Sequence, residues 1–76
     1  MKIDIVTTDE VLYSGEADIV VAPAADGQLG ILPRHAALLT SINAGVFLIR
    51  NSSGVREITV GDGFMEVNGD QVTVLV

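Results

Sequence analysis

The sequence contains no cysteine and no tryptophan, and it has a single histidine, two prolines and three aromatic residues among its 76 residues. The absence of cysteine excludes disulfides and thiolate-bound metals within the chain. A single histidine also argues against the clusters of imidazole and thiolate ligands that hold transition metals. We therefore expect no metal site and no cofactor.

Long hydrophobic runs and basic residues are also scarce. No run of about 18 apolar residues occurs, and residues 1–4 lack the apolar core of a signal peptide, so we expect an intracellular protein without direct membrane insertion. The chain has four basic and ten acidic residues, which gives a net charge of −6. Because an acidic surface repels phosphate backbones, we expect no binding to nucleic acid.

The charges are unevenly placed along the chain. All ten acidic residues lie outside residues 27–56, whereas all three arginines, Arg34, Arg50 and Arg56, lie inside. Chance in a short chain is one interpretation of this distribution. The other is that the central segment forms a contact face from which carboxylates are excluded, because burying an unpaired carboxylate is costly.

What the sequence does contain is alternation of apolar and polar residues, the pattern of half-buried strands, with Gly, Asn and Pro between the segments. Gly15 is expected to bend the chain, Pro23 to end a strand, and Asn68-Gly69 to form a type I′ hairpin turn. Residues 46–50 are apolar except for Arg50, which favours burial on both faces. Strands are expected at residues 2–7, 11–14, 16–22, 36–42, 46–50, 55–60, 64–67 and 71–76.

These segments predict one all-β domain spanning residues 1–76. Its architecture is expected to be a small β-sandwich or flattened barrel of about eight to ten short strands. Surface scaling predicts that roughly 60% of the extended chain's surface is buried, so the core is thin. Some of the aliphatic side chains are therefore available to face a partner.

Residues 26–40 break this regular pattern. Asp26-Gly27 predicts a tight turn, and Pro33 excludes a regular helix or a central strand, so we expect an irregular, shaped loop. Its apolar side chains either pack in the core or form an apolar patch with a polar rim, which is the anatomy of a protein contact. The apolar set is Leu29, Ile31, Leu38 and Leu39, and the rim is Gln28, Arg34 and His35.

Three chemical alternatives find little support in the sequence. A catalytic His35 would need a nucleophile, and Thr40 and Ser41 lie nearby in no nucleophile motif, which favours a structural histidine. Residues 27–30 lack the Lys-Ser or Lys-Thr of a phosphate-binding loop. A lipoyl- or biotinyl-type carrier domain needs a lysine at a hairpin tip, whereas Lys2, the only lysine, falls in the first expected strand.

The central segment carries a resemblance to a known family. It reads Gly27-x-Leu29-Gly30-Ile31-x-Pro33-x-His35-Ala36-x-Leu38-Leu39-Thr40. This pattern resembles the signature of the epsilon subunit of rotary F-type ATP synthase, in its N-terminal β-sandwich domain. Residues 6–15, 63–67 and 72–75 resemble other parts of the same domain, so the resemblance covers nearly the whole chain.

The resemblance implies a non-catalytic rotor subunit of the central stalk, which packs on the gamma subunit, rests on the c-ring and supports proton-driven ATP synthesis. It implies a peripheral location on the cytoplasmic face of a bacterial inner membrane, or the equivalent organellar face. A small carrier domain or another all-β interaction module is the alternative. The implied contact with the c-ring consists of Gln28, Leu29, Gly30, Ile31, Arg34 and His35.

The family usually continues past the equivalent of Val76 into a two-helix hairpin, which binds ATP in some members. The chain is therefore expected to lack that helical hairpin and to hold no nucleotide site, as a piece of a longer protein or as a naturally short form. Two positions depart from the family pattern: Gln28 stands where many relatives have an acidic residue, and Ala37 where a proline is usual.

Overall fold

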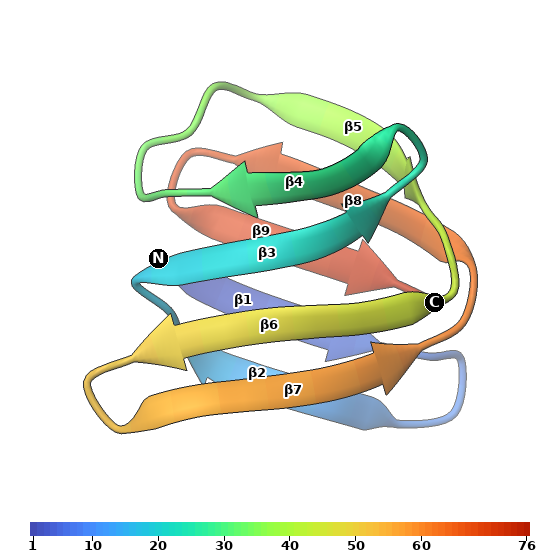
Figure 1. Cartoon of the computed structure of the whole chain (residues 1–76), viewed down its shortest axis with the longest axis horizontal. Helices are drawn as coiled ribbons and strands as arrows, with labels where there is room; N and C mark the ends of the chain where they lie inside the picture. The colour runs from blue at the N-terminus through green and yellow to red at the C-terminus, as the bar shows by residue number, and fades with distance from the viewer.

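The computed structural model describes residues 1–76 and consists of nine strands and no helix (Figure 1). The prediction of a small all-β domain is thereby confirmed. The strands are β1 (Lys2–Val6), β2 (Val11–Glu16), β3 (Ile19–Ala24), β4 (Gly27–Ile31), β5 (Leu38–Ile42), β6 (Gly45–Asn51), β7 (Gly54–Val60), β8 (Gly63–Asn68) and β9 (Gln71–Leu75).

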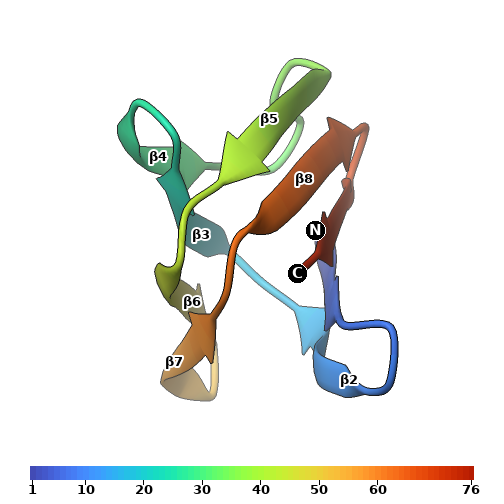
Figure 2. The same ribbon diagram turned by 90° about the vertical axis from the view of Figure 1, so that its right-hand side faces the viewer.

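The strands follow the order β2-β1-β9-β8-β5-β3-β6-β7, with β4 paired to β3 alongside this path. Figure 2 shows two layers, one of β2, β1, β9, β8 and β5 and the other of β4, β3, β6 and β7. A single residue pair, Ala24 with Ile42, joins the layers on one side. On the other side β2 and β7 are the unpaired ends of the path, so the sandwich is open there.

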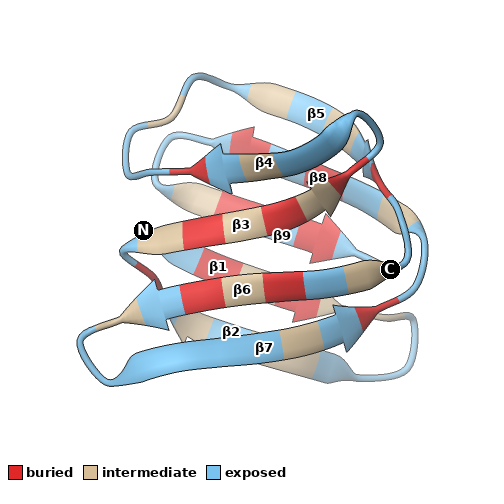
Figure 3. Ribbon diagram, in the orientation of Figure 1, coloured by how far each residue is buried: buried red, intermediate tan, exposed pale blue.

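The core lies between the two layers and contains no polar side chain (Figure 3). It forms because alternate residues of each strand point inward, as the sequence pattern predicts. The total exposed surface is 4440 Å², close to the roughly 4,500 Å² expected for a chain of this mass. The largest fully buried side chains are Phe47, Ile3, Ile5, Ile31, Ile42, Ile49 and Met65.

Two expected strand limits are wrong. Gly15 does not bend the chain but pairs with Ile3 inside β2, and the break follows β2 instead. Pro23 lies within β3, opposite Gln28 of β4. A proline is tolerated there because β6 pairs only with the first half of β3, through Val21, so no ladder hydrogen bond to β6 requires the missing N–H.

The expectation of an irregular loop is also wrong for residues 27–31, which form β4. Gly27 has a φ of 116° and begins this strand after the turn that Asp26-Gly27 predicts. Only residues 32–37 follow an irregular path. There the His35 amide donates to the Leu32 carbonyl at 3.2 Å and Arg34 has a φ of 63°, which together with Pro33 defines a type II turn.

The hairpin between β8 and β9 is present, but its turn type differs from the prediction. Asn68 pairs with Gln71, so the two loop residues are Gly69 and Asp70. Gly69 has a φ of 62°, and neither Asn68 nor Asp70 has a positive φ. A positive φ at the first loop residue alone is the pattern of a type II′ turn, whereas type I′ needs two.

Candidate interaction surfaces

A groove lies along the edge where β4 and β5 separate. It has a volume of about 320 Å³ and contains three of the residues predicted as contacts, Gln28, Leu29 and His35. The strands separate here because β5 meets β3 only through Ile42, while β4 pairs with β3 along its whole length. We call this feature the β4–β5 groove; its other lining residues are Ala24, Asp26, Gly27, Leu38 and Thr40.

His35 is held by its own loop. Its Nδ1 lies 2.8 Å from the carbonyl oxygen of Ala36, and because a carbonyl can only accept, Nδ1 carries the hydrogen. The hydroxyl of Thr40, which lines the same groove, donates to the carbonyl of Ser41 at 3.4 Å. The hydrogen bonds of His35 and Thr40 therefore lead away from each other, and the arrangement is not that of a base and its nucleophile.

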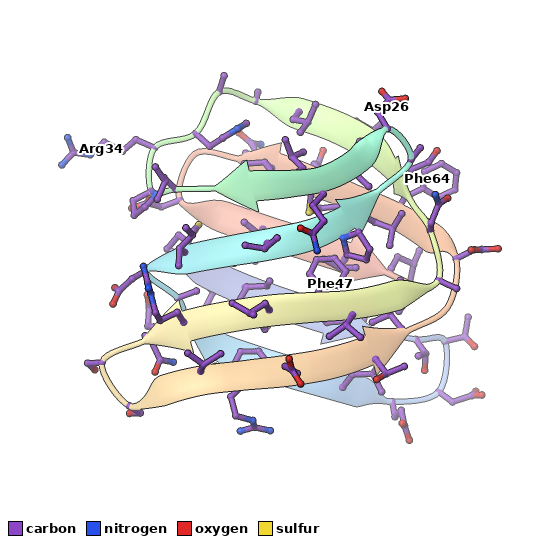
Figure 4. The ribbon with its side chains drawn as sticks, in the orientation of Figure 1. Asp26, Arg34, Phe47 and Phe64 are labelled. Carbon is purple, nitrogen blue, oxygen red and sulfur yellow. The ribbon has the colours of Figure 1, made fainter.

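The remaining predicted contact residues are dispersed. Ile31 is fully buried, so its side chain secures β4 in the core and has no surface to offer a partner. Gly30 lies in β4, outside the lining of the groove. Arg34 projects from the end of the sandwich opposite Asp26 (Figure 4), and its backbone amide donates to the Asp70 carboxylate at 3.2 Å. The predicted contact residues other than Ile31 thus lie along β4 and the loop that follows it.

The outer surfaces of the two layers differ in chemistry. In the layer that contains β1, β9 and β8, most outward positions near the middle are polar or charged, among them Asp4, Glu66 and Thr73, whereas the exposed apolar residues Phe64 and Leu75 pair at one end of the layer. The outward positions of β3 and β6 are mainly apolar and at least partly exposed, and Val55 continues this surface onto β7, where the other outward residues, Glu57 and Thr59, are polar. We call this second surface the apolar face; it consists of Ile19, Val21, Pro23, Val46, Leu48 and Val55.

From the sequence, the apolar residues 46–49 could either pack in the core or face a partner, and the structure divides them between the two sides of β6. Phe47 and Ile49 are indeed buried, but Val46 remains 44% exposed. Leu48 pairs with Val21 of β3, which makes the exposed apolar surface continuous across two strands. Residues 19–23 are all apolar, so this segment must place apolar side chains on both of its faces. This was the signal in the sequence for an apolar outer surface on β3.

The open side of the sandwich contains a polar cleft of about 430 Å³ between β2 and the β6–β7 hairpin. The guanidinium of Arg56 lies over the ring of Tyr13, 5.6 Å from its centroid. The amide nitrogen of Asn51 donates to the Glu16 carbonyl at 3.0 Å and lies 3.5 Å from the Tyr13 hydroxyl. Side chains, and not strand pairing, therefore connect the layers here.

Asp4 carries the one clearly shifted pKa of the chain. The Ser14 hydroxyl donates to one carboxylate oxygen at 2.6 Å, the Gln71 amide donates to the other at 3.0 Å, and the Lys2 ammonium lies 3.6 Å away. The Ser14 hydrogen bond is the largest cause that lowers the pKa of Asp4 below 3.8, while burial opposes the shift. Its hydrogen bonds link β1 to β2 and to β9 on the outer surface of their layer.

No group of three or more His, Cys, Asp or Glu side chains is placed to hold a metal ion, and no helix is long and apolar enough to cross a membrane. The prominent features are an exposed apolar sheet face, a groove and a cleft on a framework of paired strands. These features define a small β-sandwich domain of the protein-interaction class.

The comparison with known families identifies the class more closely. Residues 1–76 match the family described as "ATP synthase, Delta/Epsilon chain, beta-sandwich domain". The chain belongs to this family, and the resemblance read from residues 27–40 is confirmed. Lys2, which a carrier domain would need at a hairpin tip, lies instead in β1 with β2 and β9 on either side.

Named relatives agree with this assignment. The chain is 45% identical over 74 residues to the ATP synthase epsilon chain of Desulforamulus reducens, which covers 97% of this chain and 56% of the relative. It is 43% identical over 76 residues to the ATP synthase epsilon chain of Parasynechococcus marenigrum, with 100% and 56% covered. The chain thus spans little more than half the length of these relatives.

Two solved structures share the fold. A chain of the Euglena gracilis mitochondrial ATP synthase, in an assembly with the c-ring, superposes with a TM-score of 0.88 at 17% identity, over 97% of this chain and 48% of that one. A chain of the Tetrahymena thermophila mitochondrial ATP synthase central stalk and c-ring superposes with a TM-score of 0.76 at 19% identity, over 99% and 63%. At these identities the likeness concerns the fold.

Proposed function

We propose that this chain is the β-sandwich domain of a non-catalytic rotor subunit in an F-type ATP synthase. In this role it lies in the central stalk, links the gamma subunit to the c-ring and supports proton-driven ATP synthesis. Its location is peripheral, on the cytoplasmic face of a bacterial inner membrane or the equivalent organellar face. Membership of the Delta/Epsilon family and the named epsilon-chain relatives support this role.

The observation that carries the proposal is the apolar face. A free-standing domain that exposed Val21, Val46 and Leu48 on adjoining strands would leave a continuous apolar surface in water. A stalk partner that covers this surface would gain the free energy of its burial. We therefore assign the apolar face to the contact with the gamma subunit.

The β4–β5 groove and its edge are assigned to the c-ring. Gln28, Leu29 and His35 meet at the groove, while Gly30 and Arg34 extend the surface along the same edge. Ile31 supports this surface from the core. The mixture of apolar lining and polar rim suits the polar loops of a membrane ring.

Co-expression with the gamma subunit of the same organism tests the stalk contact. The native 76-residue chain is expected to co-purify with gamma in a one-to-one complex. Val46→Asp should disrupt it, because a carboxylate would be buried against an apolar partner. Leu39→Asp is the matched control, since Leu39 is 71% exposed on the other layer. Equal recovery of both variants with gamma would exclude the apolar face as the contact with the gamma subunit. A folded native chain that never binds gamma would overturn the proposal.

Substitutions at Arg34 test the ring contact in membranes that contain the assembled enzyme. Arg34→Glu should lower ATP-driven proton pumping more than Arg34→Gln, because reversing a rim charge adds repulsion whereas neutralising it only removes attraction. Gln28→Glu should have a smaller effect than either. Unchanged pumping with Arg34→Glu would remove Arg34 from the contact.

A further inference from the structure

The outer edge of β7 is a long, regular and unpaired strand edge. β7 ends the path of strands, so one of its edges has no neighbour. Its pairing with β6 runs without a register shift from Gly54 to Val60. β2, at the other end of the path, is irregular, because its register with β1 shifts after Ile5. Figure 3 shows β7 exposed along most of its length.

Unpaired edges of this kind form intermolecular strand pairs unless the protein prevents it. β7 contains no proline, no lysine and no bulge in its ladder. Its only charges are Arg56 and Glu57, adjacent residues that point to opposite faces of the sheet. On the β6 side they face the apolar Ile49 and Leu48.

Neither charge forms an ion pair within the chain. The two ion pairs of the structure join the N-terminus to Glu16 and Lys2 to Asp4. The Arg56 guanidinium instead lies across the cleft, over the Tyr13 ring. Glu57 therefore has no charged partner, and the Arg56 guanidinium contacts Tyr13 at the cleft, where the side chains of an added strand can approach it.

The same two charges disfavour pairing with a second copy of β7. In an antiparallel pair, residues directly opposite share a face, so the register that pairs the whole strand places Glu57 opposite Glu57. A shift of the two strands by two residues towards the β6–β7 hairpin keeps their hydrogen-bonding groups aligned, and it places Arg56 opposite Arg56. Like charges directly opposite destabilise a strand pair. The edge thus selects against its own copy and requires a strand of different charge pattern.

We propose that the β7 edge binds an extended segment of another protein as an added strand, with a carboxylate opposite Arg56 and a basic residue opposite Glu57. The main chain of the added strand pairs with the free N–H and C=O groups of β7. Its carboxylate points into the cleft, which has a volume of about 430 Å³, and reaches the Arg56 guanidinium. This inference goes beyond the rotor role and does not depend on it.

A seven-residue peptide, Thr-Val-Thr-Lys-Glu-Val-Thr, tests the proposal, because in antiparallel pairing over residues 54–60 its Glu lies opposite Arg56 and its Lys opposite Glu57. Titration into the isotope-labelled 76-residue chain is followed by amide chemical shifts and hydrogen exchange. Shifts and slowed exchange are expected in β7. Replacing the Glu of the peptide by Gln should weaken binding about threefold, and N-methylation of alternate peptide amides should abolish it.

The preference for Glu over Gln should disappear in Arg56→Gln. It should persist in the matched control Arg50→Gln, which changes an exposed arginine on β6. The proposal is overturned by the absence of binding, by shifts confined to strands other than β7, or by an unchanged preference in Arg56→Gln. Should that variant fail to fold, equal affinity of the native chain for the Glu and Gln peptides is the result that overturns it.

Discussion

Gly63→Ala should destabilise the domain severely, because the start of β8 passes against the end of β9. A Cβ at Gly63 would overlap the carbonyl oxygen of Leu75 and lie 2.8 Å from the Cα of Val76. Both neighbours are backbone atoms, so no side-chain rotation can relieve the clash. The Phe64–Leu75 end of the β8–β9 ladder would have to open.

The magnitude follows from two costs. Overpacking in a closely packed region costs about 1–3 kcal/mol, and each lost hydrogen bond costs about 1 kcal/mol. We expect a loss of about 3 kcal/mol, out of a total of roughly 4–11 kcal/mol for a domain of this size. At about 4–8 °C per kcal/mol for a small domain, the melting temperature should fall by roughly 12–24 °C.

Urea and thermal unfolding, followed by circular dichroism, measure this loss. Gly61→Ala is the matched control, because a Cβ at Gly61 meets nothing within 4 Å and its φ is not positive. This variant should remain within about 0.5 kcal/mol of the native chain. Equal stabilities of Gly61→Ala and Gly63→Ala would refute the reasoning from backbone contact.

Three further predictions concern packing, a carboxylate and a strained turn. Phe47→Ala removes the largest fully buried side chain and should cost about 3–5 kcal/mol in urea unfolding, whereas Phe64→Ala, at a position 59% exposed, should cost far less. Ser14→Ala should raise the pKa of Asp4 towards 3.8 in a carboxyl NMR titration. Because folding lowers the pKa of Asp4, its carboxylate contributes to the free energy of unfolding above pH 3.8, and this contribution is lost as the pH falls below that value. The Ser14→Ala variant should therefore lose less stability than the native chain in that acidic range. Arg34→Gly should stabilise the chain by about 0.5 kcal/mol. The left-handed conformation costs a residue with a side chain about 1–2 kcal/mol, and glycine removes this strain but loses part of the gain to its larger loss of backbone entropy on folding. Arg34→Ala keeps the strain and should not stabilise the chain.

Alternation of apolar residues was sufficient to predict most strands, because burial between two layers imposes a period of two. Propensity rules failed where tertiary pairing prevailed. The glycines at 27 and 30 and the proline at 23 argued for irregular chain, yet β3 and β4 form a hairpin along the edge that places Leu29 and Ile31 inward. The gain from burying those side chains outweighs the weak local preference against a strand.

The candidate contacts were predictable only in part. Three residues of the contact predicted from the motif in residues 27–40, Gln28, Leu29 and His35, line the β4–β5 groove, and their contact with a partner stays a prediction. The motif could not show that Ile31 faces the core, because the orientation of the folded strand decides which of its side chains point inward. For the strand around Val46 the sequence left both core burial and partner contact open, because an apolar residue looks the same in a sequence whether it is buried in its own core or available to a partner.

The parallel pairing of β1 with β9 has a consequence for folding during synthesis. Lys2 pairs with Gln71, and the Lys2 amide donates to the Asp70 carbonyl at 2.7 Å. At about 5–20 residues per second, translation leaves β1 without this neighbour for roughly 4–14 s. Such distant pairing predicts slow, late closure of the layer. Until β9 emerges from the ribosome, β1 can pair only with β2, and the nascent domain is most exposed to aggregation in that interval.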